Sequence, residues 1–106
     1  MFQGLEIAME VLRRFVPVQK KIRMKSRSLA DQGGRACDSV ILCMSEGRSR
    51  VGLDRVDLFR KSLGSARELG DALRIAEVRE LITHEEFRWV DEPLDQVRAI
   101  LWKMTR

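Results

Sequence analysis

Tyrosine is absent from this chain of 106 residues, proline occurs twice and histidine occurs once. So few turn-forming residues favour long helices joined by few loops. His84, the single histidine, has no partner at the Glu-x-x-His spacing that metal sites in helix bundles use. No nucleophile or second base is specified beside it either. We therefore expect no catalytic residue, bound metal, cofactor or small-molecule substrate.

Cysteine and long apolar runs are also scarce. Cys37 and Cys43 are six residues apart, which is about 240° of rotation on one helix, so neither a disulfide nor a shared metal is expected. The longest uncharged run, 39–45, is too short to cross a bilayer. Glu6 and Glu10 stand where a signal peptide would need apolar residues. These features predict a cytoplasmic protein with reduced cysteines and no membrane partner.

The chain does contain a helical periodicity of apolar residues. The clearest example has spacings of three and four, and consists of Phe87, Val90, Leu94, Val97, Leu101 and Met104. Similar seams predict helices over residues 2–24, 28–45 and from 54 to 79 or 80. Pro17 lies inside the first of them, where either a kink or an end at Val16 is expected, and Pro93 predicts a bend in the last. The fold class is therefore all-α, a single antiparallel up-down-up-down four-helix bundle that forms one domain over residues 1–106.

Helix ends and close contacts can also be read from local signals. Ser28 and Asp54 are expected N-caps, Thr83 with Glu86 fits a capping box, and Gly47 is expected to end the second helix in a left-handed conformation. Glycine is costly inside a helix, so Gly33 and Gly34 predict that another backbone approaches closely there. A second group of small residues predicts a close helix contact and consists of Ser62, Gly64, Ser65 and Ala66.

Positive charge is concentrated in the first half of the chain. Residues 1–53 carry ten Lys and Arg against five Asp and Glu, or +5, whereas residues 54–106 carry ten against eleven, or −1. No acid lies between Glu10 and Asp31, a stretch that holds Arg13, Arg14, Lys20, Lys21, Arg23, Lys25 and Arg27. This run is either a solvated helix end or a patch that contacts RNA phosphates.

Some apolar residues lie off the predicted core seams. They are Ile41, Trp89, Ile100 and Trp102. A bundle hides one stripe on each helix, so a second stripe indicates a partner, while a tryptophan off the seam either caps the core edge or lies in a subunit contact.

Two segments resemble a known bacterial family. Residues 32–47, QGGRACDSVILCMSEG, are similar to the pattern QxRRAAxSIPxNIAEG of the four-helix-bundle proteins encoded in intervening sequences of large-subunit ribosomal RNA genes. The later segments GSAREL (64–69), LRIA (73–76) and LITHEE (81–86) are similar to the family's GSLxEL, LxIA and YLSxEE. Ile41 and Cys43 depart from its proline and asparagine. The resemblance implies a cytoplasmic bacterial bundle that assembles into a ring-like oligomer such as a pentamer, and it keeps RNA as an alternative partner.

We therefore predict a non-enzymatic homo-oligomeric interaction module whose partner is a second copy of itself. The alternative is an RNA-binding protein that acts through the basic run.

Overall fold

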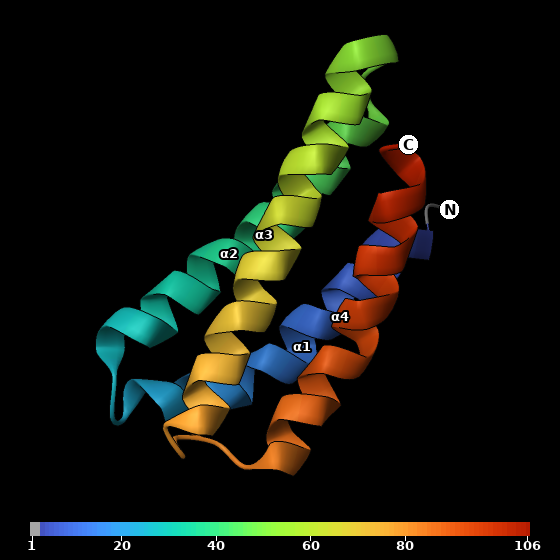
Figure 1. Cartoon of the computed structure of the whole chain (residues 1–106). Coiled ribbons are helices and arrows are strands. Elements are labelled where there is room, and N and C mark those ends of the chain that lie inside the picture. The colour runs from blue at the N-terminus through green and yellow to red at the C-terminus, as the bar shows by residue number, and fades with distance from the viewer. Residues whose placement is uncertain (1–2) are drawn as a thin grey trace.

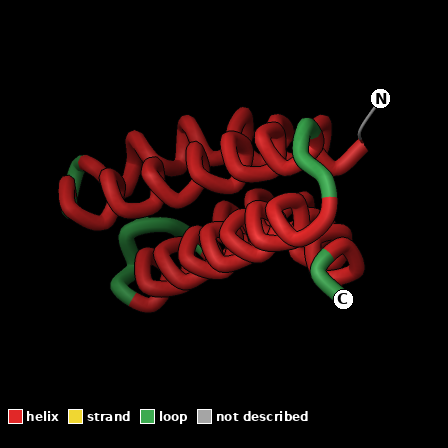
Figure 2. Tube along the Cα trace, turned by 90° about the horizontal axis from the view of Figure 1, so that it is seen from above, coloured by secondary structure: helices red, strands yellow, loops and turns green. Residues whose placement is uncertain are grey.

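The computed structural model describes residues 3–106 and contains four α-helices within that range, with no strand. They are α1 (Gln3–Arg23), α2 (Arg27–Arg48), α3 (Gly52–Val78) and α4 (His84–Met104). Consecutive helices run in opposite directions (Figure 1), and short loops connect them (Figure 2). The expected all-α four-helix bundle is confirmed.

The hairpin of α2 and α3 is the longest part of the molecule. α3 has 27 residues and α2 has 22, whereas α1 and α4 have 21 each. As a result, the turn between α2 and α3 projects past the beginning of α1 and the end of α4 (Figure 1). The molecule measures 42 × 22 × 20 Å along its principal axes, so this hairpin extends along its greatest dimension.

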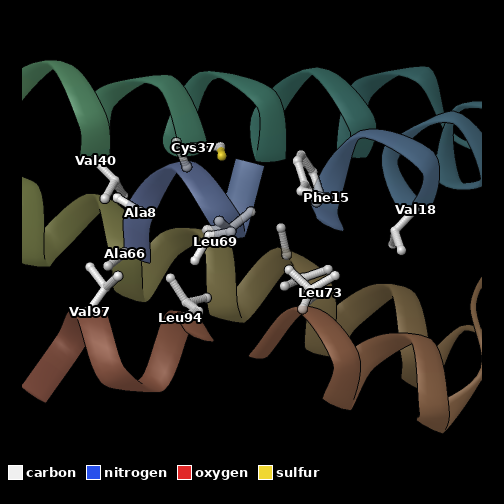
Figure 3. Packing of buried hydrophobic residues seen from close by; sticks show 14 of the residues in the cluster. Ala8, Phe15, Val18, Cys37, Val40, Ala66, Leu69, Leu73, Leu94 and Val97 are labelled. Atoms are coloured by element: carbon white, nitrogen blue, oxygen red, sulfur yellow. The ribbon is translucent and has the colours of Figure 1, made fainter. Parts of the chain in front are cut away.

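The predicted seams of α3 and α4 form the centre of the core. In α3 every seam residue is buried, namely Phe59, Ser62, Ala66, Leu69, Leu73 and Ala76. In α4 the buried residues Val90, Leu94, Val97 and Leu101 are flanked by the partly buried Phe87 and Met104. Figure 3 shows Leu69 and Leu73 between the helix that carries Leu94 and the one that carries Phe15. Burial of this continuous apolar surface is the main force that holds the helices together.

The small residues mediate close contacts, but mostly with side chains rather than backbone. A Cβ at Gly33 would lie 2.8 Å from Cζ of Phe15, and Gly34 faces the side chain of Gln19. The buried Ser62 hydroxyl donates a 2.7 Å hydrogen bond to the carbonyl of Val40, which joins α3 to α2. By contrast, nothing lies within 4 Å of the Cβ position at Gly64. The backbone approach expected at Gly33 and Gly34 is therefore wrong, because α1 side chains fill that space.

Three of the predicted helix ends also differ. The N-cap of α2 is Ser26, whose hydroxyl accepts from the amide of Leu29 at 3.3 Å, so Ser28 already lies inside the helix. Helix α2 continues through Gly47, which is buried against the ring of Phe59. Packing, and not a left-handed turn, therefore accounts for that glycine.

The start of α3 precedes the predicted cap Asp54. The helix begins at Gly52, whose φ of +65° favours glycine, and its N-cap is Val51, which provides no side-chain hydrogen bond. The capping box of α4 is confirmed: the Thr83 hydroxyl accepts from the Glu86 amide, and the Glu86 carboxylate accepts from the Thr83 amide.

Both prolines lie inside continuous helices. α1 passes through Pro17 without ending at Val16, and α4 passes through Pro93. The predicted helix start at Phe2 lies outside the described residues.

Candidate interaction surfaces

The amino-terminal part of the basic run belongs to the body of α1. Arg13 and Arg14 each contact Glu10 at 3.0 Å, and Arg14 also lies 3.6 Å from Glu92 on α4. Hydrogen bonds from the two guanidinium groups, led by that of Arg14, lower the pKa of Glu10. These two arginines therefore stabilise carboxylates of their own chain.

Two further members of the run are paired near the turn between α1 and α2. Lys21 contacts Glu86 at 2.8 Å, and this hydrogen bond is the main reason why the pKa of Glu86 is lowered. Arg23 contacts Asp31 at 2.6 Å and lowers the pKa of that carboxyl in the same way. The run is thus partly neutralised by acids that lie outside it in the sequence.

The other three basic residues form the unpaired part of the run, although the charge of Arg27 also helps to lower the pKa of Asp31. Lys20, Lys25 and Arg27 are exposed, and within residues 3–106 they make no ion pair. We call these three residues the turn cations, because they flank the turn between α1 and α2. The turn between α2 and α3 lies at the opposite end of the molecule (Figure 1).

The four predicted oligomer contacts differ in their surroundings. Ile41 packs against the core edge, and Ile100 is only partly exposed. Trp89 is 46% exposed, yet the Arg14 guanidinium lies 5.6 Å from its ring centroid and donates a hydrogen bond to its carbonyl. Trp89 therefore caps the edge between α1 and α4, whereas Trp102 is 53% exposed near the end of α4.

The most exposed large apolar side chains were not among those predicted contacts. Leu53 is 85% exposed and Val51 is 82% exposed, and both lie at the projecting turn between α2 and α3. Val78, near the other end of α3, is 77% exposed, while Met24 and Leu42 are exposed elsewhere.

A shallow hollow lies on the outer face of α3 near its carboxyl end. Its volume is about 490 Å³, and its lining residues are Asp71, Arg74, Ile75, Val78 and Arg79. These positions follow the i, i+3, i+4 spacing of one helix face, so their side chains are neighbours. Ile75 and Val78 are the apolar members of this lining. We call this feature the α3 hollow.

Groups with chemical reactivity are few. Within residues 3–106 no group of three or more His, Cys, Asp or Glu is placed to hold a metal ion. His84 is exposed at the start of α4 and shares a hydrogen bond with the Glu77 carboxylate. Burial, aided by the charge of Asp38, raises the pKa of the Cys37 thiol to about 12. Among the same residues, no helix is both long enough and apolar enough to cross a membrane.

Residues 3–103 match the family model described as 23S rRNA-intervening sequence protein. The chain belongs to this family. A search of curated proteins finds no match. Among solved structures, the fold is similar to a crystal structure of a protein with unknown function from the S23 ribosomal protein family of Bacteroides thetaiotaomicron VPI-5482. The TM-score is 0.88 at 17% identity, over 97% of this chain and 98% of that one. That identity establishes likeness of fold alone.

The sequence segments that resemble the 23S rRNA-intervening sequence proteins lie on the central hairpin and the next turn. Residues 32–47 lie within α2, residues 64–69 and 73–76 lie within α3, and residues 81–86 lead into α4. Most of the resemblance therefore concerns the two helices α2 and α3.

Proposed function

We propose that this member of the 23S rRNA-intervening sequence family is a non-enzymatic, homo-oligomeric interaction module. The observation that supports this proposal is the apolar surface at the two ends of the α2–α3 hairpin, where Val51, Leu53 and Val78 are each more than three-quarters exposed. Single exposed apolar residues are ordinary, but groups of them are typical of protein–protein contacts.

The proposal that catalysis is absent has its own support. The single histidine, His84, is exposed and shares a hydrogen bond with the Glu77 carboxylate, and no nucleophile is hydrogen-bonded to it within residues 3–106. The Cys37 thiol is buried and its pKa is raised, which disfavours the nucleophilic thiolate. Both cysteines are free thiols, which also supports our proposal of a reducing cytoplasmic location.

Sedimentation velocity on the purified chain at tens of micromolar tests directly whether the protein is a homo-oligomer. We expect a species whose mass is a stable multiple of the monomer, and a mass of five chains would match the ring-like pentamer that the family resemblance implies. A monomer across the whole concentration range would contradict the proposal.

RNA binding is the second candidate function. It is supported by the turn cations, Lys20, Lys25 and Arg27, because exposed cations that form no ion pair within residues 3–106 can contact phosphates. If each contacts one phosphate of single-stranded RNA, the slope of log affinity against log salt is about −2, from about −0.7 per contact.

A gel-shift titration at two salt concentrations tests the RNA candidate. Reversing the charge of all three turn cations to Glu should abolish most binding, whereas the matched control Arg13→Glu should retain it because Arg13 is paired with Glu10. No binding at low salt, or equal binding by both variants, would show that the turn cations are merely solvated.

A further inference from the structure

Three arginines from two helices line one hollow between α3 and α4. They are Arg67 and Arg74 from α3 and Arg98 from α4. The volume of the hollow is about 240 Å³, below the roughly 300–1,000 Å³ of pockets that hold drug-sized ligands, so a smaller molecule fits it. The rest of its lining consists of Gly70, Asp71, Phe87 and Asp91. We call this feature the arginine hollow, and it adjoins the α3 hollow, with which it shares Asp71 and Arg74.

Arg98 is held in a fixed position at the wall of the arginine hollow. Its Nη2 donates hydrogen bonds to Asp91 at 3.0 Å and to Asp95 at 3.2 Å, and its side chain is only 24% exposed. Its Nη1 lies 3.0 Å from the position that a Cβ at Gly70 would occupy, and within residues 3–106 it donates no hydrogen bond. Gly70 therefore leaves room for a guanidinium group that is anchored through Nη2 and can still donate through Nη1.

The two arginines of α3 form no ion pair within residues 3–106. Both are exposed, and the guanidinium group of Arg74 lies 5.9 Å from the centroid of the Phe87 ring. Arg67 and Arg74 are seven residues apart, so they emerge on the same side of α3, about 10 Å from each other along its axis. Arg98 adds a third guanidinium group from the opposite wall.

The acids of the lining do not balance these three cations. Asp91 is paired with Arg98, which leaves Asp71 as the one carboxylate against Arg67 and Arg74. Each guanidinium group has five N–H donors, whereas a carboxylate offers only two acceptor oxygens. A diphosphate group offers more oxygens and more than one negative charge, and guanidinium groups bind such oxygens through strong, charge-assisted hydrogen bonds.

We propose that the arginine hollow is a binding site for a small anion that carries a diphosphate group. Arg67 and Arg74 contact the phosphate oxygens from α3, and Nη1 of Arg98 donates from α4. The inference goes beyond the proposed function and does not depend on it, because all three arginines belong to one chain. It also shares no residue with the turn cations.

Isothermal titration calorimetry with inorganic diphosphate in about 0.1 M salt tests the site. We expect the wild type to bind one diphosphate per chain. Arg67→Gln and Arg74→Gln should each weaken binding at least about tenfold, because each removes hydrogen bonds to a charged ligand. Asp71→Asn should instead strengthen binding about fivefold, because it removes the opposing carboxylate. All three positions are exposed, so circular dichroism should be unchanged.

Arg60→Gln is the matched control. Arg60 lies seven residues before Arg67 on α3, is exposed, forms no ion pair within residues 3–106 and does not line the hollow. Its replacement removes the same charge from the same helix. Because the Debye length in about 0.1 M salt is about 10 Å, binding by this variant should stay within about twofold of the wild type.

The result that would overturn the site is a wild type that does not bind diphosphate, or an equal loss of affinity in Arg60→Gln and in the two hollow variants. Weaker binding by Asp71→Asn would also contradict it. A parallel titration with a single-stranded RNA identifies the source of the phosphate, because RNA binding without diphosphate binding would overturn the small-anion site in favour of the RNA candidate. None of these results changes the mass of the assembly, so the homo-oligomer is tested separately.

Discussion

Gly33 on α2 faces the ring of Phe15 on α1 so closely that an added Cβ would lie 2.8 Å from Cζ of that ring. Phe15 is 1% exposed and surrounded by the core, so its ring cannot move away easily. The crossing of α1 over α2 thus depends on the lack of a side chain at residue 33, which explains why the helix tolerates a residue of low helix propensity there.

Gly33→Ala should therefore lower the free energy of unfolding. Overpacking of a core costs about 1–3 kcal/mol, and it is partly offset by the gain in helix propensity of about 1 kcal/mol, so a net loss of about 1 kcal/mol is expected. Urea unfolding followed by circular dichroism measures it.

The matched control for that variant is Gly64→Ala. Its Cβ would meet nothing within 4 Å on the outer face of α3. The same substitution should stabilise the protein by about 0.5–1 kcal/mol there, because only the propensity gain remains. Equal changes in the free energy of unfolding at the two positions would contradict the conclusion that the lack of space beside Phe15 requires glycine at residue 33.

Ser62 provides a second test of the α2–α3 contact. Its hydroxyl is buried and donates to the Val40 carbonyl. Ser62→Ala should destabilise the protein by about 1 kcal/mol, the net contribution of one buried hydrogen bond. Ser65→Ala, whose hydroxyl only bonds the partly exposed Ser39 hydroxyl, is the comparison and should cost less.

The start of α4 makes stability depend on pH. The pKa of Glu86 is lowered from its ordinary value of 4.5 by the Lys21 ammonium and by the Thr83 amide. A carboxyl whose pKa is lower in the folded state stabilises the fold above its unfolded pKa, and this contribution is lost as the pH falls through the folded pKa. Wild type should therefore be more stable than Glu86→Gln at pH 7, and the difference should vanish in acid.

Thr83→Ala separates the cap from the ion pair. It removes the hydroxyl that accepts from the Glu86 amide and should cost about 1 kcal/mol at neutral pH. Since the hydroxyl does not titrate, most of this loss should persist in acid well below pH 4.5, where Glu86 is protonated, as chemical unfolding at neutral and acidic pH can show. A loss that followed the titration of Glu86 would contradict this assignment.

The two cysteines should react differently with a thiol reagent. Cys37 is 1% exposed and its pKa is raised to about 12, so at pH 8 it is protonated and inaccessible. Cys43 is only partly buried. One thiol per chain should react quickly in the folded protein and two after unfolding, while Cys43→Ser should leave none that react quickly.

The parts of the fold that could be predicted from the sequence are those set by local periodicity. The α4 seam from Phe87 to Met104 and the Thr83 capping box depend only on neighbours within two turns, and both are confirmed. The end of α2 could not be predicted from local periodicity, because Gly47 packs against the ring of Phe59, which lies twelve residues later in the chain.

The candidate surfaces were less predictable for a similar reason. The basic run was visible as a cluster, but Lys21 pairs with Glu86 and Arg14 contacts Trp89, partners that only the folded chain brings near. The exposure of Val51 and Leu53 follows from the extra length of the α2–α3 hairpin, which depends on where four helices end. Periodicity does not determine those ends.

Native mass spectrometry of the wild-type chain over a range of concentrations tests the central claim, that this bundle assembles with itself, most directly. We expect one discrete assembly with an integer number of chains that persists on dilution to micromolar concentration. A spectrum that contains only single chains at every concentration would contradict it.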